Sequence, residues 1–207
     1  MNKLTILTAF LGLTALPGVA RAEFVHAKLI GFQEVPSVST VARGEFRARI
    51  SKDEQSIQYE LTYEGLQGAV TQAHIHIAQR HVNGGIVLWF CGTQPSNPGP
   101  AGTPTCTPGS GTFTGTFTMA NVQAIGGANI SQQVAAGELA KVIAALRAGA
   151  AYANVHTDLS TGGEIRGQIH PFDRHKDKDH DHDKDNDKHH DHDHDKDKDK
   201  HHDDHRR

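Results

Sequence analysis

The sequence predicts an all-β domain, a sandwich or barrel of about eight short strands with one short helix, followed by a disordered C-terminal tail. Three observations predict this class. Apolar and polar residues alternate over many short segments, Gly, Pro, Asn or Ser residues separate these segments, and a single segment has helical spacing.

The alternation begins close to the N-terminal end of the domain. In FVHAKLI, residues 24–30, one face would carry Val25, Ala27 and Leu29 and the other His26 and Lys28, as expected of a half-buried strand. The same period places Phe46, Ala48 and Ile50 inward in GEFRARI, and Ile57, Tyr59, Leu61 and Tyr63 inward in SIQYELTY. Further strands are expected at residues 73–78, 86–90, 112–118, 151–157 and 164–170.

One segment, GELAKVIAALRAG, has the period of a helix instead. Its apolar residues Leu139, Val142, Ile143 and Leu146 would share one helical face, and Gly149 suits the left-handed position that follows a helix. We expect this helix to cover one end of the sandwich.

The N-terminal residues 1–22 have the pattern of a secretory signal peptide. A short basic start precedes an apolar run, a Pro17-Gly18 break and small residues up to Ala22. The alternative is an uncleaved membrane anchor, but the apolar run is shorter than the roughly 20 residues that a span requires. We therefore expect a secreted or periplasmic protein, with no stable membrane span after cleavage.

The two cysteines, Cys91 and Cys106, flank a segment rich in Pro and Gly. In an oxidising compartment they are expected to form a disulfide that restrains this segment, with free thiols as the alternative. Closing a loop of about 15 residues would stabilise the fold by about 3 kcal/mol. Residues 23–173 thus form one predicted domain, without an internal linker.

The tail, residues 174–207, consists of Asp, His, Lys and Arg apart from Asn186. Such a composition cannot bury apolar surface and predicts disorder. Its mixed charges, within a chain of net charge −3, do not favour nucleic acid as a partner. Imidazole and carboxylate at this density predict capture of divalent metal ions, and the candidate ligands are His180, His182, His189, His190, His192 and His194. A solubilising tail is the alternative.

The stretch QAHIHI offers a candidate metal site within the domain. If Ala73, Ile75 and Ile77 face the core, His74 and His76 point to the outer face of the sheet. The segments AYANVHT and GEIRGQIH likewise direct His156 and Glu164 outward. Imidazole suits zinc, copper, nickel or iron, so a site at His74, His76 and His156 is one hypothesis. Surface histidines that hydrogen-bond to neighbours such as Asn154 or Glu164 are the other.

Several motifs, taken together, resemble the CHRD domain, which was first described in chordin and occurs in many secreted bacterial proteins. They are LIGFQEVP at residues 29–36, Gly44, Gly65-Leu66, AHIH at 73–76, NGGIV at 83–87 and AGAAYANVHTDLSTGGEIRGQI at 148–169. The resemblance implies an immunoglobulin-like β-barrel with limited similarity to copper/zinc superoxide dismutases, and no settled activity. The His-x-His of those dismutases resembles His74-Ile75-His76, but their other ligands have no assured match.

Two functions of different classes follow from these patterns. The first is a secreted, non-catalytic CHRD module that binds a protein or matrix partner and captures metal with its tail. The second is a metalloprotein or redox enzyme with zinc, copper or nickel at the outward histidines. No elbow motif of a Ser-His-Asp site, no Gly-rich phosphate-binding loop followed by a helix and no Cys-x-x-Cys pair occurs in the sequence, so we expect binding rather than catalysis.

Overall fold

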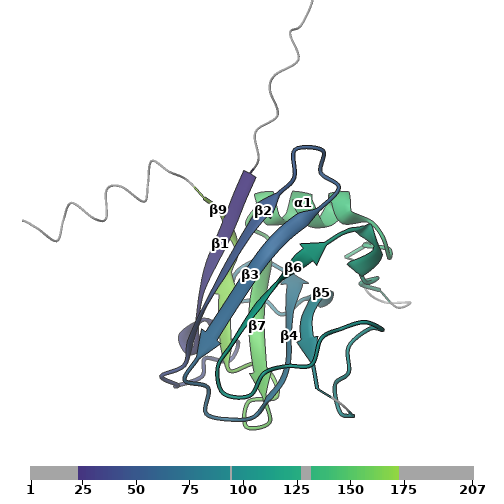
Figure 1. Ribbon diagram of the computed structural model, residues 1–207. Coiled ribbons are helices and arrows are strands. Elements are labelled where there is room, and N and C mark those ends of the chain that lie inside the picture. Colours follow the sequence, from purple (N-terminus) through teal and green to yellow (C-terminus); the bar gives the residue numbers. More distant parts are fainter. Residues whose placement is uncertain (1–22, 94, 127–131, 173–207) are drawn as a thin grey trace, which may run out of the picture. The chain divides into compact units, whose positions relative to one another are not determined.

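The computed structural model describes residues 23–93, 95–126 and 132–172. The expected signal peptide and tail lie outside these residues. Within them the fold is mostly β, as the sequence predicts: nine strands form one nearly closed antiparallel sheet, a barrel or sandwich, and one α-helix covers an end of it (Figure 1).

Every pair of neighbouring strands in the sheet is antiparallel, but several neighbours are far apart in the sequence. They are β1 (Glu23–Ile30), β2 (Arg43–Ile50), β3 (Ile57–Glu64), β4 (Val70–Ile77), β5 (Gly85–Gly92), β6 (Gly111–Phe117), β7 (Ala151–Thr157), β8 (Ile165–Gln168) and β9 (His170–Pro171). The order in the sheet is β5-β4-β7-β8-β1-β2-β3-β6, and β9 also pairs with β1. Two short 3₁₀ helices, Gly31–Gln33 and Met119–Asn121, follow β1 and β6.

One predicted strand is divided in two. The alternation of residues 164–170 predicts a single strand, but β8 ends at Gln168 and β9 begins at His170. Between them, the Ile169 backbone N–H donates to the Ala151 carbonyl at the start of β7, while β9 pairs with the beginning of β1. This segment therefore pairs with β7 on one side and with β1 on the other.

The apolar core lies where the period-2 pattern places it. Nine of the residues predicted to face inward are buried: Val25, Ala27, Leu29, Phe46, Ala48, Ile50, Ile57, Leu61 and Tyr63. The tenth, Tyr59, is partly buried and packs against them. Aromatic rings join strands that are distant in the sheet order: the Phe90 ring centroid of β5 is 5.6 Å from that of Phe46 in β2 and 5.1 Å from that of Tyr59 in β3. The sheet therefore closes upon its own apolar face.

The predicted helix is α1, Leu139–Arg147, and it lies at one end of the sheet (Figure 1). Its four apolar residues Leu139, Val142, Ile143 and Leu146 are buried, and Gly149 after it has a φ of +65°. On its exposed side Arg147 forms ion pairs with Glu23 and Glu54 at 2.7 Å and 2.6 Å. The predicted helix, its C-terminal end and its buried face are thus confirmed.

The disulfide is formed between Cys91, in β5, and Cys106. Both cysteines belong to the apolar core, and the Gly92 N–H donates to the Pro104 carbonyl beside the bond. The Pro- and Gly-rich segment is therefore tied to β5 by a covalent bond and by backbone pairing.

Candidate metal centre

The outward histidines are not surface residues, as the alternation of QAHIHI predicts them to be. His74, His76 and His156 lie on the face of β4 and β7 opposite the apolar core, yet they are only 0%, 8% and 6% exposed. Asn154, Arg166 and Gln168 on the same face of β7 and β8 are buried as well, whereas His170 is exposed. The sheet alternation identified the face correctly, but that face is covered.

Two loops cover it, and polar side chains of the sheet hold them in place. Arg166 donates from its guanidinium to the Val82 carbonyl at 2.8 Å and to Asn83 Oδ1 at 3.0 Å. Asn83 Nδ2 in turn donates to the Val35 carbonyl, which links the loop before β5 to the loop after β1. Gln168 Nε2 donates to the Ala78 carbonyl at 3.0 Å. The result is a second buried layer, which is polar.

The three histidines meet within this layer because β4 and β7 are neighbours. In the strand register His74 lies opposite Asn154 and Gln72 lies opposite His156, so that His156 is a diagonal neighbour of His74. The His74 ring centroid is 4.5 Å from that of His76 and 4.6 Å from that of His156. One nitrogen from each ring lies within 4.8 Å of the other two. We call these three residues the His cluster.

In the rings of His76 and His156, a hydrogen bond to one nitrogen shows that the other nitrogen carries no proton. His76 Nδ1 lies 2.8 Å from the Gly84 carbonyl oxygen, and His156 Nδ1 lies 2.9 Å from that of Thr161. A carbonyl oxygen only accepts, so both Nδ1 atoms carry the proton, and in a neutral ring Nε2 is then a bare lone pair. Among the described residues, neither of these Nε2 atoms nor either nitrogen of His74 has a hydrogen-bond partner.

Burial keeps these rings uncharged. It lowers the pKa of His76 to about 4 and lowers the pKa of His156. The pKa of His74 falls well below its usual range, first because of burial and then because of the neighbouring His76 and His156. Neutral imidazoles with bare, unpartnered nitrogens are the form in which histidine binds a metal.

The donors fit a transition metal in number and chemistry. Three imidazoles are a common protein ligand set, and a buried nitrogen without a partner is costly unless something binds it. With bonds of about 2.0–2.1 Å, two nitrogens on one tetrahedral ion are about 3.4 Å apart, so small rotations of the rings would close the cluster.

Aromatic and cationic side chains surround the His cluster. Trp89, the register partner of His74 on β5, places its ring centroid 5.0 Å from the His74 ring. Tyr152 stacks on His76 with centroids 4.6 Å apart and an interplanar angle of 7°. The Arg166 guanidinium carbon lies 3.4 Å from the Tyr152 ring centroid. A positive charge is therefore separated from the cluster by one aromatic ring.

Two buried carboxyl groups complete the layer, and they differ in their partners. Glu164 accepts hydrogen bonds from Thr40, from the Gln67 backbone N–H and from Thr157, all at 2.9 Å, and it does not join the His cluster. Glu34 is 4% exposed, and burial raises its pKa to about 8. Its Oε1 has no partner in the described part of the chain.

Sequence reasoning did not assign a role to Glu34, Tyr152 or Trp89 at this site, and for Arg166 it expected an ion pair with Glu164 or support for His156, whereas Arg166 binds Val82 and Asn83. Most of these residues, however, belong to the quoted motifs: Glu34 lies in LIGFQEVP, and Tyr152 and Arg166 lie in the segment 148–169. The motifs AHIH and NGGIV supply the His pair and the Gly84 carbonyl. Motifs that are far apart in the sequence thus supply side chains to one buried layer.

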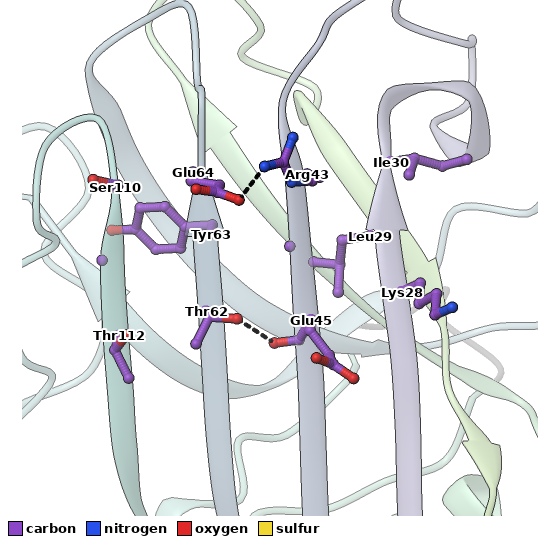
Figure 2. Close-up of a pocket in the computed structure, with 12 residues that line it drawn as sticks. Lys28, Leu29, Ile30, Arg43, Glu45, Thr62, Tyr63, Glu64, Ser110 and Thr112 are labelled. Atoms are coloured by element: carbon purple, nitrogen blue, oxygen red, sulfur yellow. Dashed lines mark hydrogen bonds and ion pairs between the residues drawn. The ribbon is translucent and has the colours of Figure 1, made fainter.

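An open groove lies elsewhere, on the outer face of β1, β2, β3 and β6 (Figure 2). It has a volume of about 710 Å³, and the Arg43–Glu64 ion pair spans part of it at 2.7 Å. No residue of the His cluster lines it. The groove therefore offers no access to the histidines.

The predicted tail ligands His180, His182, His189, His190, His192 and His194 lie outside the described residues, as does the expected signal peptide. In the described part of the chain, no helix has the length and apolar character needed to cross a bilayer.

The class of protein defined by these features is a disulfide-bonded β-barrel or sandwich with a buried polar layer on one outer face. The family model of the CHRD domain matches residues 25–169, and the chain belongs to the CHRD domain family. No curated protein and no solved structure matches the chain.

Proposed function

We propose that this CHRD-domain protein is a secreted or periplasmic metal-binding protein, whose folded domain holds one transition-metal ion at His74, His76 and His156. The observation that carries the proposal is the hydrogen bonding of the cluster. Two Nδ1 protons are committed to backbone carbonyls, which leaves bare Nε2 atoms beside the unpartnered ring of His74. The same arrangement, in which a backbone carbonyl orients a ligating imidazole, is usual around protein-bound metals.

Binding is favoured over catalysis because of the burial of the cluster. All three histidines are at most 8% exposed, so a bound ion would be retained while a substrate would have no open path to it. Zinc, copper and nickel all suit imidazole ligands. The ion supplies charge and Lewis acidity where it binds, and this chain's residues orient the rings and exclude water.

The tail is proposed as a second, weaker site of capture. Its alternating Asp and His residues offer many transient ligand sets, including His180, His182 and His189. Ordering such a segment around an ion costs conformational entropy, so its affinity per ion should be lower than that of a preformed cluster. Export is supported by the signal-peptide pattern, the disulfide and the family.

The test is the metal content of the domain without its tail. Residues 174–207 are removed, the remainder is purified from its native compartment, and bound metal is measured by mass spectrometry. We expect a stoichiometric transition metal that is lost in His74→Ala and retained in the control His26→Ala, since His26 lies on β1 away from the cluster. His76→Gln serves as a second variant, and circular dichroism verifies that each is folded. Metal found only in the full-length protein would refute the site in the folded domain.

A further inference from the structure

A buried carboxyl group without a full set of partners stands beside the proposed metal centre. Glu34 is 4% exposed, and its Oε1 accepts no hydrogen bond from the described residues. An unsatisfied buried polar atom costs roughly 1–3 kcal/mol, more when it is charged. Packing of the fold does not account for this cost, so we look for a role of Glu34 in binding.

The chain makes room for this carboxyl group at one glycine. Gly163 has a φ of +122°, and a Cβ on it would lie 2.3 Å from Glu34 Oε1 and 2.7 Å from its carboxyl carbon. Any other residue there would displace the Glu34 side chain. The loop before β8 is therefore shaped around Glu34.

The neighbours of Glu34 connect it to the His cluster. Asn154 lies opposite His74 in the register of β7 and β4, and its side chain lies near Glu34, His74 and His76, although it makes no hydrogen bond to Glu34 Oε1 or to either nitrogen of His74. The Arg166 guanidinium and the Val35 backbone N–H also favour the charged form of Glu34. Glu34 is thus separated from the histidines by a single amide side chain.

A cation bound at the His cluster would find little negative charge in the buried layer. The three imidazoles are neutral, and Arg166 places a buried positive charge behind Tyr152 that disfavours further positive charge at His76. Glu164 already accepts three hydrogen bonds, so its carboxyl oxygens are satisfied within its own surroundings. A cation placed in the cluster would require a counter-charge, because burial of uncompensated charge is costly.

We infer that Glu34 supplies this counter-charge: it is a positioning residue that binds no metal itself, acts across Asn154, and allows the His cluster to hold a divalent ion. This inference rests on the proposed metal centre. It predicts a dependence on the charge of the ion, since Coulomb energy is proportional to the product of the two charges. A residue with a purely structural role would affect ions of either charge alike.

The experiment compares Zn²⁺ with Ag⁺, a redox-inert monovalent ion, in the domain that ends at residue 173. Dissociation constants are measured by chelator competition at pH 8.5 for the wild type and for Glu34→Gln, which preserves the shape of the side chain. Glu34→Gln should weaken Zn²⁺ binding by at least about tenfold and Ag⁺ binding by about threefold, the first factor being close to the square of the second.

Two further variants separate the charge of Glu34 from its shape and from the overall charge of the domain. Glu34→Asp keeps the charge and should keep the wild-type ratio of Zn²⁺ to Ag⁺ affinity. Glu60→Gln makes the same charge change on an exposed position of β3, and solvent screening should limit its effect to about twofold. Equal losses for the two ions in Glu34→Gln, or no loss, would overturn the counter-charge role while leaving the metal centre intact. A wild type that binds neither ion would refute the metal centre itself, and the role of Glu34 with it.

Discussion

The two faces of β4 and β7 are both buried, but they are buried by different means. On the inner face Ala73, Ile75 and Val155 pack into an apolar core, where any side chain of similar size and shape would serve. On the outer face histidine, asparagine, arginine and carboxyl groups are enclosed by loops that hydrogen bonds fix in place. The first face explains why the chain folds, whereas the second contains groups that folding alone does not require.

The difference teaches where to look for function in a domain of this kind. Apolar burial stabilises a fold by roughly 25 cal/mol per Å² and leaves no polar atom unpaired. The outer layer instead leaves seven buried side-chain N or O atoms without partners among the described residues. Four of these are histidine nitrogens that converge on one place, which is why we treat the layer as a binding site.

The two faces of β4 and β7 should differ most in how they make stability depend on pH, because only the outer face carries titratable side chains. Glu34 has a pKa of about 8 when folded and 4.5 when unfolded, so between these values the folded state holds a proton that the unfolded state has lost. The free energy of unfolding should therefore fall as the pH rises through this window, by on the order of 4–5 kcal/mol.

The histidines act in the opposite direction at lower pH. His76 has a pKa of about 4 when folded and 6.5 when unfolded, so the free energy of unfolding should rise by about 3 kcal/mol between pH 4 and 6.5, and His74 and His156 add to the rise. Urea titrations of the metal-free domain should thus show greatest stability near pH 6.5. Glu34→Gln should flatten the fall above pH 6.5 and steepen the rise between pH 4.5 and 6.5, and a wild-type stability that continues to rise to pH 8 would contradict the burial of Glu34.

The disulfide tests the inner face. Cys91 and Cys106 both belong to the apolar core, so replacing both with Ala should lower the free energy of unfolding by about 3 kcal/mol, as expected for a closed loop of 15 residues. The Zn²⁺ affinity of the folded protein should change by less than about threefold, because the cysteines do not face the His cluster. Chemical unfolding and chelator competition measure the two quantities, and a collapse of affinity at unchanged stability would argue against the separation of the faces.

Two adjacent glycines provide a smaller and more local test. Gly163→Ala should cost about 2 kcal/mol, because the new Cβ meets the Glu34 carboxyl group at a positive φ. Gly162→Ala is the matched control: no heavy atom lies within 4 Å of its Cβ, and the change should stay within about 0.5 kcal/mol. Equal stability of the two variants in thermal unfolding would contradict both the positive φ of Gly163 and its contact with Glu34.

The sequence predicted the inner face almost completely and the outer face only in part. The alternation in GEFRARI and SIQYELTY depends on contacts between neighbouring strands, so Phe46 and Leu61 could be assigned to the core without further knowledge. The single helix and the disulfide followed from equally local signals. His74, His76 and His156 could be placed on one face for the same reason.

What no periodicity reveals is that loops distant in the chain cover this face. The burial of the histidines depends on Arg166 binding Val82 and Asn83, and on Asn83 binding Val35, contacts that span tens of residues. Glu34 follows a short 3₁₀ helix and has no strand period, so its burial could not be inferred from alternation. Such side chains are located only when the loops are seen in three dimensions.

The most direct test of the proposed metal centre is the position of the ion. Crystals of residues 23–173 grown with Zn²⁺ and measured at the zinc absorption edge should show an anomalous peak about 2.0–2.1 Å from Nε2 of His76, Nε2 of His156 and one ring nitrogen of His74. Zinc found only at exposed residues such as His170, with the His cluster empty, would contradict the proposed centre.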